Sequence, residues 1–354
     1  MLLLDNDDIR RVFDVRTCMD SLEAAYRAQA RGEAVNRPRT QTYVPLPEPD
    51  LMYCLKTMEG SLPHTGYMAL RLTSDVVSEA MVDGMPRRDK LPRGPGGTYC
   101  GLILLFSVRE LAPVAMLQDG LIQVNRVACT SALATRLLAR EDASDLAMIG
   151  SSGQAWAHLV AIAAVRALRR VRVYSPNRER REAFAARARL ELGLATEAMD
   201  TAFMAIEGAD IVVAATNTSV PVVKGEWLAP GTHVVSIVSG DERLDRRELD
   251  DEVFARARTV IVHSKELAMN QQQADLAGPV AAGVLSWERM HDLTELIAGA
   301  APGRLGADDI TVFKNNVGLG LQFAAVASQV YEDALRAGIG RQLPDEWFLQ
   351  KMKP

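Results

Sequence analysis

From Asp145 onward, the sequence alternates short apolar runs with segments that have the spacing of helices, such as "RERREAFAARARLELG". Five of these runs are flanked by turn residues: "LAMIGSS", "RVRVYSP", "ADIVVAAT", "THVVSIVS" and "TVIVHS". A strand that is apolar along its whole length must be covered on both faces, and helices between parallel strands provide that cover. The alternation therefore predicts an α/β fold built on a parallel sheet.

The residues before about Leu121 have a mixed pattern. One helix is predicted over "RVFDVRTCMDSLEAAYRAQARGEA", followed by β-like pieces that Pro and Gly separate: "RTQTYVPL", "LMYCLKTM", "YMALRLTSD" and "GLILLFSV". The stretch "DGMPRRDKLPRGPGGTYCG" is the most loop-like in the chain. Further helices are predicted over "NRVACTSALATRLLARED" and from about Asn316 to Ala337.

The composition is that of a globular protein, with 48% apolar and 24% charged residues and a net charge of −5. Because no basic stripe stands out, we expect no nucleic-acid partner. The longest apolar run is too short to cross a membrane, and the start of the chain turns acidic too soon for a secretory signal, so we expect a cytoplasmic protein. The cysteines and histidines are scattered without metal-site spacing, so no metal is predicted: Cys18, Cys54, Cys100, Cys129, His64, His158, His233, His263 and His291.

The turn after the first apolar run resembles a dinucleotide-binding turn. In such turns the first glycine makes the bend, the second lets the backbone approach a pyrophosphate, and a small third residue allows close helix packing. Gly150 and Ala155 hold the first and third positions, whereas Ser152 replaces the second glycine and Gly153 follows it. The helix start offers free N–H groups to an anion, and the Ser152 hydroxyl could bond a phosphate oxygen. The expected cofactor contacts are Gly150, Ser151, Ser152, Gly153, Gln154 and Ala155. A purely structural turn is the alternative interpretation.

The end of the second run, "VYSPNRERRE", bears on the choice between NAD and NADP. An NAD site usually has a carboxylate here for the ribose 2′-hydroxyl, while an arginine accommodates a 2′-phosphate. No acid stands at this point, and Arg178 follows at once. We therefore expect NADP(H) rather than NAD(H), held by Ser175, Asn177 and Arg178. The alternative is that the arginines are a solvated helix start.

Taken in order, several segments resemble the ornithine cyclodeaminase/μ-crystallin family: "QVNRVACTSALATRLLA", "IGSSGQA", "ADIVVAATNTSVPVV", "LAPGTHVVSIVSGDERLDRRELD" and "DDITVFKNNVGLGLQFAAVASQVYEDALRAGIG". The resemblance implies a Rossmann-type parallel sheet domain inserted into a mixed α/β substrate-binding and dimerisation domain. We assign residues 131–312 to the Rossmann domain, and 1–130, completed by 313–354, to the other. The resemblance also implies a homodimer and a small carboxylate substrate.

The resemblance assigns roles to three arginines. Arg39 matches an arginine that contacts the substrate, and Arg126 matches one that grips its carboxylate, a task that suits a guanidinium group. Arg71 stands where the family usually has a lysine. An arginine can hold a carboxylate or polarise a carbonyl, but it does not exchange protons as a buried lysine does. Arg71 is thus a candidate for substrate binding and catalysis, with proton transfer in doubt.

The loop "SGDERLDRREL" matches the place of a proton-transferring aspartate in the family, so either Asp241 or Glu242 is the candidate acid. A charged surface loop is the alternative. Lys314 approaches the nicotinamide in one interpretation and caps a helix in the other. Phe323 follows Gln322 where many members have an acid, which indicates a different subgroup. The remaining assigned cofactor contacts are Thr216, Asn217, Thr218, Val238 and Lys314.

These features favour an NAD(P)H-dependent reductase or dehydrogenase that acts on the C=N or C–N bond of a small imino or amino acid. The first alternative is an NAD-using amino-acid cyclodeaminase, a lyase that releases ammonia. The second is an NADPH-binding module, or subunit, that works through a partner without catalysis of its own.

Overall fold

The structure, a computed structural model, describes residues 1–82, 85–238 and 246–352, without the side chains of residues 79, 80, 82 and 85–87. The chain divides into two compact units. The first contains Met1–Met81, Arg88–Arg126 and Gly318–Pro354; the second contains Val127–Val317 with Val82–Arg87. These boundaries lie four and five residues from the expected 130/131 and 312/313. The assignment of one unit to substrate and the other to dinucleotide stays a prediction.

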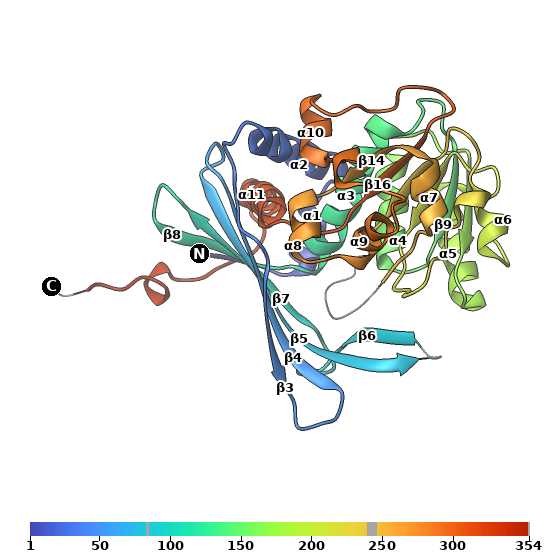
Figure 1. The fold of residues 1–354 in the computed structure, drawn as a ribbon. Helices are drawn as coiled ribbons and strands as arrows, with labels where there is room; N and C mark the ends of the chain where they lie inside the picture. Colours follow the sequence, from blue (N-terminus) through green and yellow to red (C-terminus); the bar gives the residue numbers. More distant parts are fainter. Residues whose placement is uncertain (83–84, 239–245, 353–354) are drawn as a thin grey trace. The chain divides into compact units, whose positions relative to one another are not determined.

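The second unit is built on a sheet of eight described strands, in which every neighbouring pair is parallel (Figure 1). The prediction of a parallel sheet is confirmed, and three more strands than the five apolar runs take part. In spatial order the strands are β11 (Ala195–Ala198), β10 (Arg170–Tyr174), β9 (Asp145–Ile149), β12 (Ile211–Ala214), β13 (His233–Ser236), β16 (Ile310–Lys314), β14 (Ala257–Val262) and β15 (Met290–Asp292).

Helices connect these strands, and most begin at a side chain that caps them. Asp250, Ser264 and Thr201, for example, each accept a bond from a backbone N–H in the first turn of the following helix. The helices are α3 (Gly120–Leu138), α4 (Gly153–Ala163), α5 (Arg178–Leu192), α6 (Ala202–Ile206), α7 (Asp251–Arg256), α8 (Lys265–Asn270), α9 (Ala274–Ala281) and α10 (Leu293–Ala298), with 3₁₀ turns η1 (Gly225–Trp227) and η2 (Trp287–Arg289).

The strand order indicates at which edge of this sheet a ligand is expected to bind. The chain runs from β9 to β10 on one side and later returns to β12 on the other side of β9. In open α/β sheets, ligands bind outside the carboxyl ends of the strands where the order reverses in this way. The turn after β9 and the residues after β12 therefore border the expected crevice.

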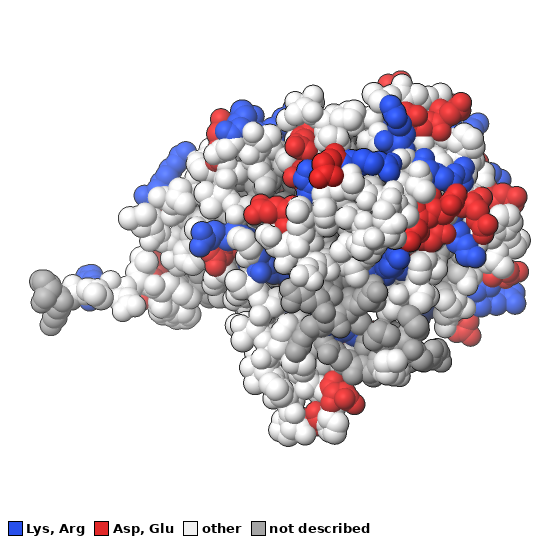
Figure 2. All heavy atoms as spheres, in the orientation of Figure 1, with Lys and Arg blue, Asp and Glu red and all other residues white. Residues whose placement is uncertain are grey.

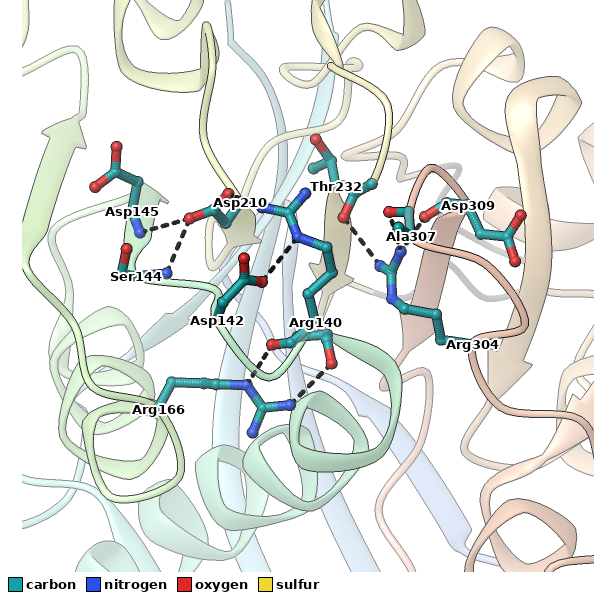
Figure 3. A network of polar contacts seen from close by, with 12 residues as sticks. Arg140, Asp142, Ser144, Asp145, Arg166, Asp210, Thr232, Arg304, Ala307 and Asp309 are labelled. Atoms are coloured by element: carbon teal, nitrogen blue, oxygen red, sulfur yellow. Dashed lines mark hydrogen bonds and ion pairs between the residues drawn. The ribbon is translucent and has the colours of Figure 1, made fainter.

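The opposite, amino-terminal edge is held by an arginine network (Figure 3). The guanidinium groups of Arg166 and Arg304 donate to backbone carbonyls, including those of the last turn of α3. Arg140 pairs with Asp210, which also accepts from the N–H groups of residues 144 and 145. Burial raises the pKa of Asp210, but these backbone bonds and Arg140 outweigh it and lower that pKa below its usual value. The network is structural and lies at the other end of the strands from the crevice.

The first unit is built on a mainly antiparallel sheet of nine described strands. Their main order is β17 (Arg341–Gln342), β1 (Leu2–Leu4), β8 (Ala112–Gln118), β7 (Cys100–Ser107), β5 (Tyr67–Val82), β4 (Leu51–Leu62) and β2 (Val35–Asn36), with β3 (Thr40–Pro45) paired to β4 and β6 (Met85–Leu91) paired to β5. The helices are α1 (Asn6–Val12), α2 (Val15–Ala30) and α11 (Gly320–Ala337), with the 3₁₀ turn η3 (Asp345–Trp347).

Helix α11 lies unusually close to β4 because glycines face each other across the contact. A Cβ on Gly60 would lie 2.1 Å from the Leu321 nitrogen, and one on Gly320 would lie 2.0 Å from the Glu59 carbonyl oxygen. Any larger residue would push the helix off the strand. The first turn of α11 is thereby fixed against the middle of the sheet face.

Three expectations about elements were wrong. The helix predicted over residues 11–34 is two helices, because Asp14 caps a new one at Val15. The last helix begins at Gly320 rather than about Asn316. The stretch predicted as loop, residues 83–101, contains β6, since pairing with the edge of β5 overrides its local composition.

The surface carries both signs of charge. Figure 2 shows Lys and Arg side chains interspersed with Asp and Glu over the face drawn. Every helix in the described ranges is too short or too polar to span a bilayer.

Candidate active site

The turn after β9 is shaped so that only glycine fits at its first position. Gly150 has φ +120°, and a Cβ there would lie 2.3 Å from the carbonyl oxygen of Ala215, just after β12. Its N–H donates to the Tyr174 carbonyl at the end of β10, 2.8 Å away. The turn is thus held between the ends of both neighbouring strands, as a cradle for a pyrophosphate requires.

The serine in the second position caps the helix. Ser152 is the N-cap of α4, and its hydroxyl accepts from the Ala155 N–H at 3.5 Å. The hydroxyl accepts in this cap and keeps its hydrogen to donate, so the contact with a phosphate oxygen stays a prediction. The helix start remains a suitable anion site, because Gly153 has open space around it. Gln154 fits a bound ligand as well, since its buried Oε1 has no hydrogen-bond partner among the described residues.

At the end of β10, the predicted contacts lie beside this turn. The Ser175 hydroxyl is 2.8 Å from that of Ser151, which joins the two loops. Asn177 caps α5 by accepting from the Arg180 N–H. Arg178 is exposed and pairs with Glu182, 2.7 Å away on the same helix. Among these described residues, no carboxylate follows β10 directly to accept a hydrogen bond from the ribose 2′-hydroxyl of NAD. The region is basic instead.

Glu248 was missed by the sequence analysis and ties the ends of β12 and β13 together. Its carboxylate is fully buried. One oxygen accepts from the N–H and hydroxyl of Thr216, both at 2.8 Å. The other accepts from the Ser236 hydroxyl and from the N–H groups of Ile237 and Val238, at 2.7, 2.9 and 2.9 Å. The predicted contacts Thr216 and Val238 are therefore positioned by one side chain.

Lys314, at the end of β16, belongs to the same buried cluster. Its ammonium group donates to the Ser236 hydroxyl at 2.8 Å and to the Val238 carbonyl, and it pairs with Asp275 at 2.8 Å. With 1% of its side chain exposed, Lys314 holds strand ends together. A direct contact with a cofactor stays a prediction for Lys314, as it does for Thr218 and for the exposed Asn217.

The proposed acids, Asp241 and Glu242, lie outside the described residues. Within those residues, no group of three or more His, Cys, Asp or Glu side chains is arranged to hold a metal ion.

In the first unit, Arg126 is buried against the start of α11. It donates to the side-chain oxygens of Gln322 and Gln123 at 2.8 and 2.9 Å, and its guanidinium lies 5.2 Å from the centre of the Phe323 ring. Burial lowers the pKa of Arg126 to about 9, and the positive charges of Arg71 and Arg39 add to that effect. Arg71 and Arg39, the other two predicted substrate-binding arginines, are therefore close enough to Arg126 to repel it.

Arg71 lies on β5, directly opposite Met58, and is itself neutralised. Its guanidinium donates to the carboxylate of Asp119 at 2.7 and 2.9 Å. The same guanidinium lies 5.1 Å from the centre of the Phe323 ring, so the ring faces both arginines. The Phe323 ring thus stands at the position after Gln322 where the sequence analysis noted an acid in many family members. Neither Asp119 nor this role of Phe323 was predicted, since both depend on contacts between distant segments.

Comparisons with known proteins agree with this architecture. A model of the ornithine cyclodeaminase/mu-crystallin family matches residues 2–338. The Delta(1)-pyrroline-2-carboxylate reductase of Bacillus cereus is 34% identical over 247 residues, 70% of this chain and 74% of its own. The structure of Thermococcus litoralis Delta(1)-pyrroline-2-carboxylate reductase with NADH and L-proline has a TM-score of 0.82 at 29% identity, covering 97% of this chain and 100% of its own. An archaeal alanine dehydrogenase dimer with bound NAD also has a TM-score of 0.82, at 26% identity, covering 97% and 99%. The family resemblance is thereby confirmed: this chain belongs to the ornithine cyclodeaminase/mu-crystallin family.

Proposed function

We propose that the protein is an NADP(H)-dependent reductase of the C=N bond of a small imino acid. The observation that carries the proposal is the gathering of Arg126, Arg71 and Arg39 in the first unit, with Arg126 buried. A buried cation whose pKa is lowered by neighbouring cations is stabilised by an anion placed beside it, and a substrate carboxylate is such an anion. The named reductases among the relatives support the predicted reaction class.

Each unit contributes a part of the chemistry. A bound dihydronicotinamide supplies a hydride for the carbon of the C=N bond. Arg126, fixed by Gln322 and Gln123, is suited to hold the carboxylate in one orientation, which the planar guanidinium does by two parallel bonds. The turn at Gly150 and the N-terminus of α4 are suited to hold a pyrophosphate.

The test is NADPH oxidation with purified protein and a panel of cyclic imino acids, and of 2-oxo acids with ammonia or an amine. We expect turnover with at least one imino acid, and a fall in kcat/KM of about 100-fold or more in Arg126→Met, as when one partner of a buried charge pair is removed. Arg336→Met, which removes an exposed arginine of α11, is the matched control. Cofactor binding without turnover across the panel would contradict the proposal. Ammonia release from ornithine or lysine without net NADH formation would indicate the cyclodeaminase instead.

The preference for NADP(H) is the finer part of the proposal, and Arg178 tests it. Loss of a bond to a charged group costs about 1.5–3 kcal/mol, so Arg178→Ala should lower the ratio of NADPH to NADH affinity by roughly 10- to 100-fold. Arg187→Ala is the control, because Arg187 forms the same i,i+4 pair, with Glu191, farther along α5. Equal affinities of the unchanged protein for the two cofactors would exclude the preference.

We also propose that the protein is a homodimer, as the archaeal alanine dehydrogenase is. The C-terminal segment extends away from the body of the first unit in Figure 1 and exposes several large apolar side chains: Trp347, Leu349 and Met352. Light scattering should give about twice the chain mass of 38.6 kDa.

A further inference from the structure

Thr73 on β5 has a buried hydroxyl group that no neighbouring group bonds. The residue is 3% exposed, and its Oγ1 atom has no hydrogen-bond partner among the residues that the structure describes. A buried hydroxyl without a partner is unfavourable, because it has lost its bonds to water. Such groups are few in folded proteins, and a role in binding is one reason to keep them.

This hydroxyl lies on the sheet face that carries Arg71. Side chains alternate along a strand, so Thr73, two residues after Arg71, points to the same side of the sheet. On β4 the residue directly opposite Arg71 is Met58, and the residue directly opposite Thr73 is Lys56. The Arg71 guanidinium lies 3.9 Å from the Met58 sulfur, so the side chains of the two strands meet on this face. Thr73 is therefore a neighbour of a predicted substrate-binding arginine.

On the other side of Thr73, a glycine leaves room for a carboxylate. Gly101 of β7 is directly opposite Thr73, and a Cβ there would lie 2.1 Å from the Oδ1 atom of Asp119. The Asp119 carboxylate thus fills the space over Gly101, and it accepts from the Arg71 guanidinium at 2.7 and 2.9 Å. This carboxylate is therefore engaged by a cation and leaves the Thr73 hydroxyl unbonded.

The charges around Thr73 favour an oxygen atom as its partner. The half-buried Lys56, opposite on β4, brings an ammonium group to the face. Asp75, the next residue of β5 on this face, is neutralised by Lys90, 2.7 Å away. A hydroxyl can turn its lone pairs towards such cations and donate its hydrogen to an acceptor. An acceptor that carries negative charge gives the strongest bond.

We propose that Thr73 recognises an oxygen atom on the side chain of the substrate. This inference rests on the proposed function, and it makes the substrate an imino acid whose side chain carries an oxygen acceptor, such as a second carboxylate. With the α-carboxylate held by Arg126, a side chain that reaches along β5 past Arg71 meets the Thr73 hydroxyl, which donates its hydrogen to the oxygen. Thr73 transfers neither hydride nor proton, so it determines specificity.

Matched pairs of substrates test this recognition. Oxaloacetate and 4-methyl-2-oxopentanoate have the same shape, as do 2-oxoglutarate and 5-methyl-2-oxohexanoate, but the second of each pair has methyl groups in place of the side-chain carboxylate oxygens. With ammonia and NADPH, we expect the wild type to have a higher kcat/KM for the oxygen-bearing member of at least one pair. A hydrogen bond to a charged group is worth roughly 10- to 100-fold in affinity, so Thr73→Val should lower that preference by about this factor. Thr73→Ser retains the hydroxyl and should retain the preference.

The matched control is Thr42→Val on β3. Thr42 is exposed and follows Gln41, which is directly opposite Lys56, so it points to the other face of the sheet. This variant should keep both kcat/KM values. A second readout needs no turnover, because removal of an unbonded buried hydroxyl should not lower the melting temperature of Thr73→Val. A clear fall would mean that the hydroxyl is bonded within the protein, which would contradict the proposal.

The outcomes separate this inference from the proposed function. If the wild type reduces no imino acid, the proposed function fails and the role of Thr73 fails with it. If the wild type reduces cyclic imino acids alone, or shows no preference for the oxygen-bearing member of either pair, only the role of Thr73 is wrong. An equal loss on both members of a pair in Thr73→Val would also overturn it, since Thr73 would then bind a group that the two substrates share.

Discussion

Gly150 is the residue whose replacement tests the dinucleotide site most directly. Alanine there would adopt φ +120° and place its Cβ 2.3 Å from the Ala215 carbonyl oxygen, so the turn must deform. Backbone strain of this kind costs about 1–3 kcal/mol, before the cost of the contact itself. We expect Gly150→Ala to weaken NADPH binding at least 10-fold and to lower the melting temperature, as measured by calorimetry.

The control for this prediction is Gly193→Ala, at the end of α5. Gly193 also has a positive φ, +65°, but nothing lies within 4 Å of its missing Cβ. It should lose a little stability and bind NADPH as the wild type does. Equal binding by Gly150→Ala would show that the turn does not hold the cofactor.

At this scale, sequence predicts the residues whose roles are set by neighbours along the chain. Gly150 lies between an apolar run and a helix, so its turn could be identified from local pattern. Glu248 could not be, because its partners lie at the ends of β12 and β13, which are separate in the sequence. In the sequence, Glu248 looks like one acid in a charged loop.

Among the elements, β12 and β13 depend on one carboxylate for the geometry of their ends. In Glu248→Gln an NH₂ group would replace an oxygen that accepts two or three bonds, and would face donors instead. Leaving buried donors unpaired costs about 1–3 kcal/mol each. We expect the free energy of unfolding to fall by about 2–4 kcal/mol and NADPH affinity to weaken, measured by urea titration and calorimetry.

Glu226→Gln, an exposed glutamate in the same unit, is the control and should change neither quantity by much. If Glu248→Gln behaved in the same way, the network after β12 and β13 would not matter for the cofactor site.

Elements with strong local patterns could be predicted, and those created by pairing could not. The runs that became β9, β12, β13 and β14 are mainly apolar, and valine alternates with arginine in β10. By contrast, β6 contains Pro86 and several charges, and it exists because β5 offers an edge. The added strands β11 and β15 are only four and three residues long, too short for a periodic signal.

For the whole molecule, the order of segments explains why a family resemblance added what periodicity could not. The first unit is assembled from three stretches of chain, and Arg126 and Gln322 meet although they are 196 residues apart. Local sequence patterns do not predict that contact. The ordered motifs made it foreseeable, because the family resemblance that they carry implied that the last helix returns to the first domain.

The stability of the molecule should depend on pH through two buried histidines of the second unit. Burial lowers the pKa of His158 to about 4, and burial with the charges of Arg304 and Arg166 lowers that of His233 to about 3. Both values lie below the usual 6.5, so the unfolded chain binds more protons below pH 6.5. Their stabilising contribution is therefore complete above pH 6.5 and is lost as the pH falls towards 4.

Each histidine should remove about 1 kcal/mol per pH unit between pH 6 and 5 from the free energy of unfolding. Tryptophan fluorescence in urea can follow this loss, because three of the four tryptophans, Trp156, Trp227 and Trp287, lie in the second unit. His233→Phe removes one titrating group, so its stability should fall less steeply with acid by about that amount, whereas the exposed His64→Gln should follow the wild type. An unchanged slope in His233→Phe would mean that His233 is protonated in the folded protein, which its buried position beside Arg304 makes unfavourable.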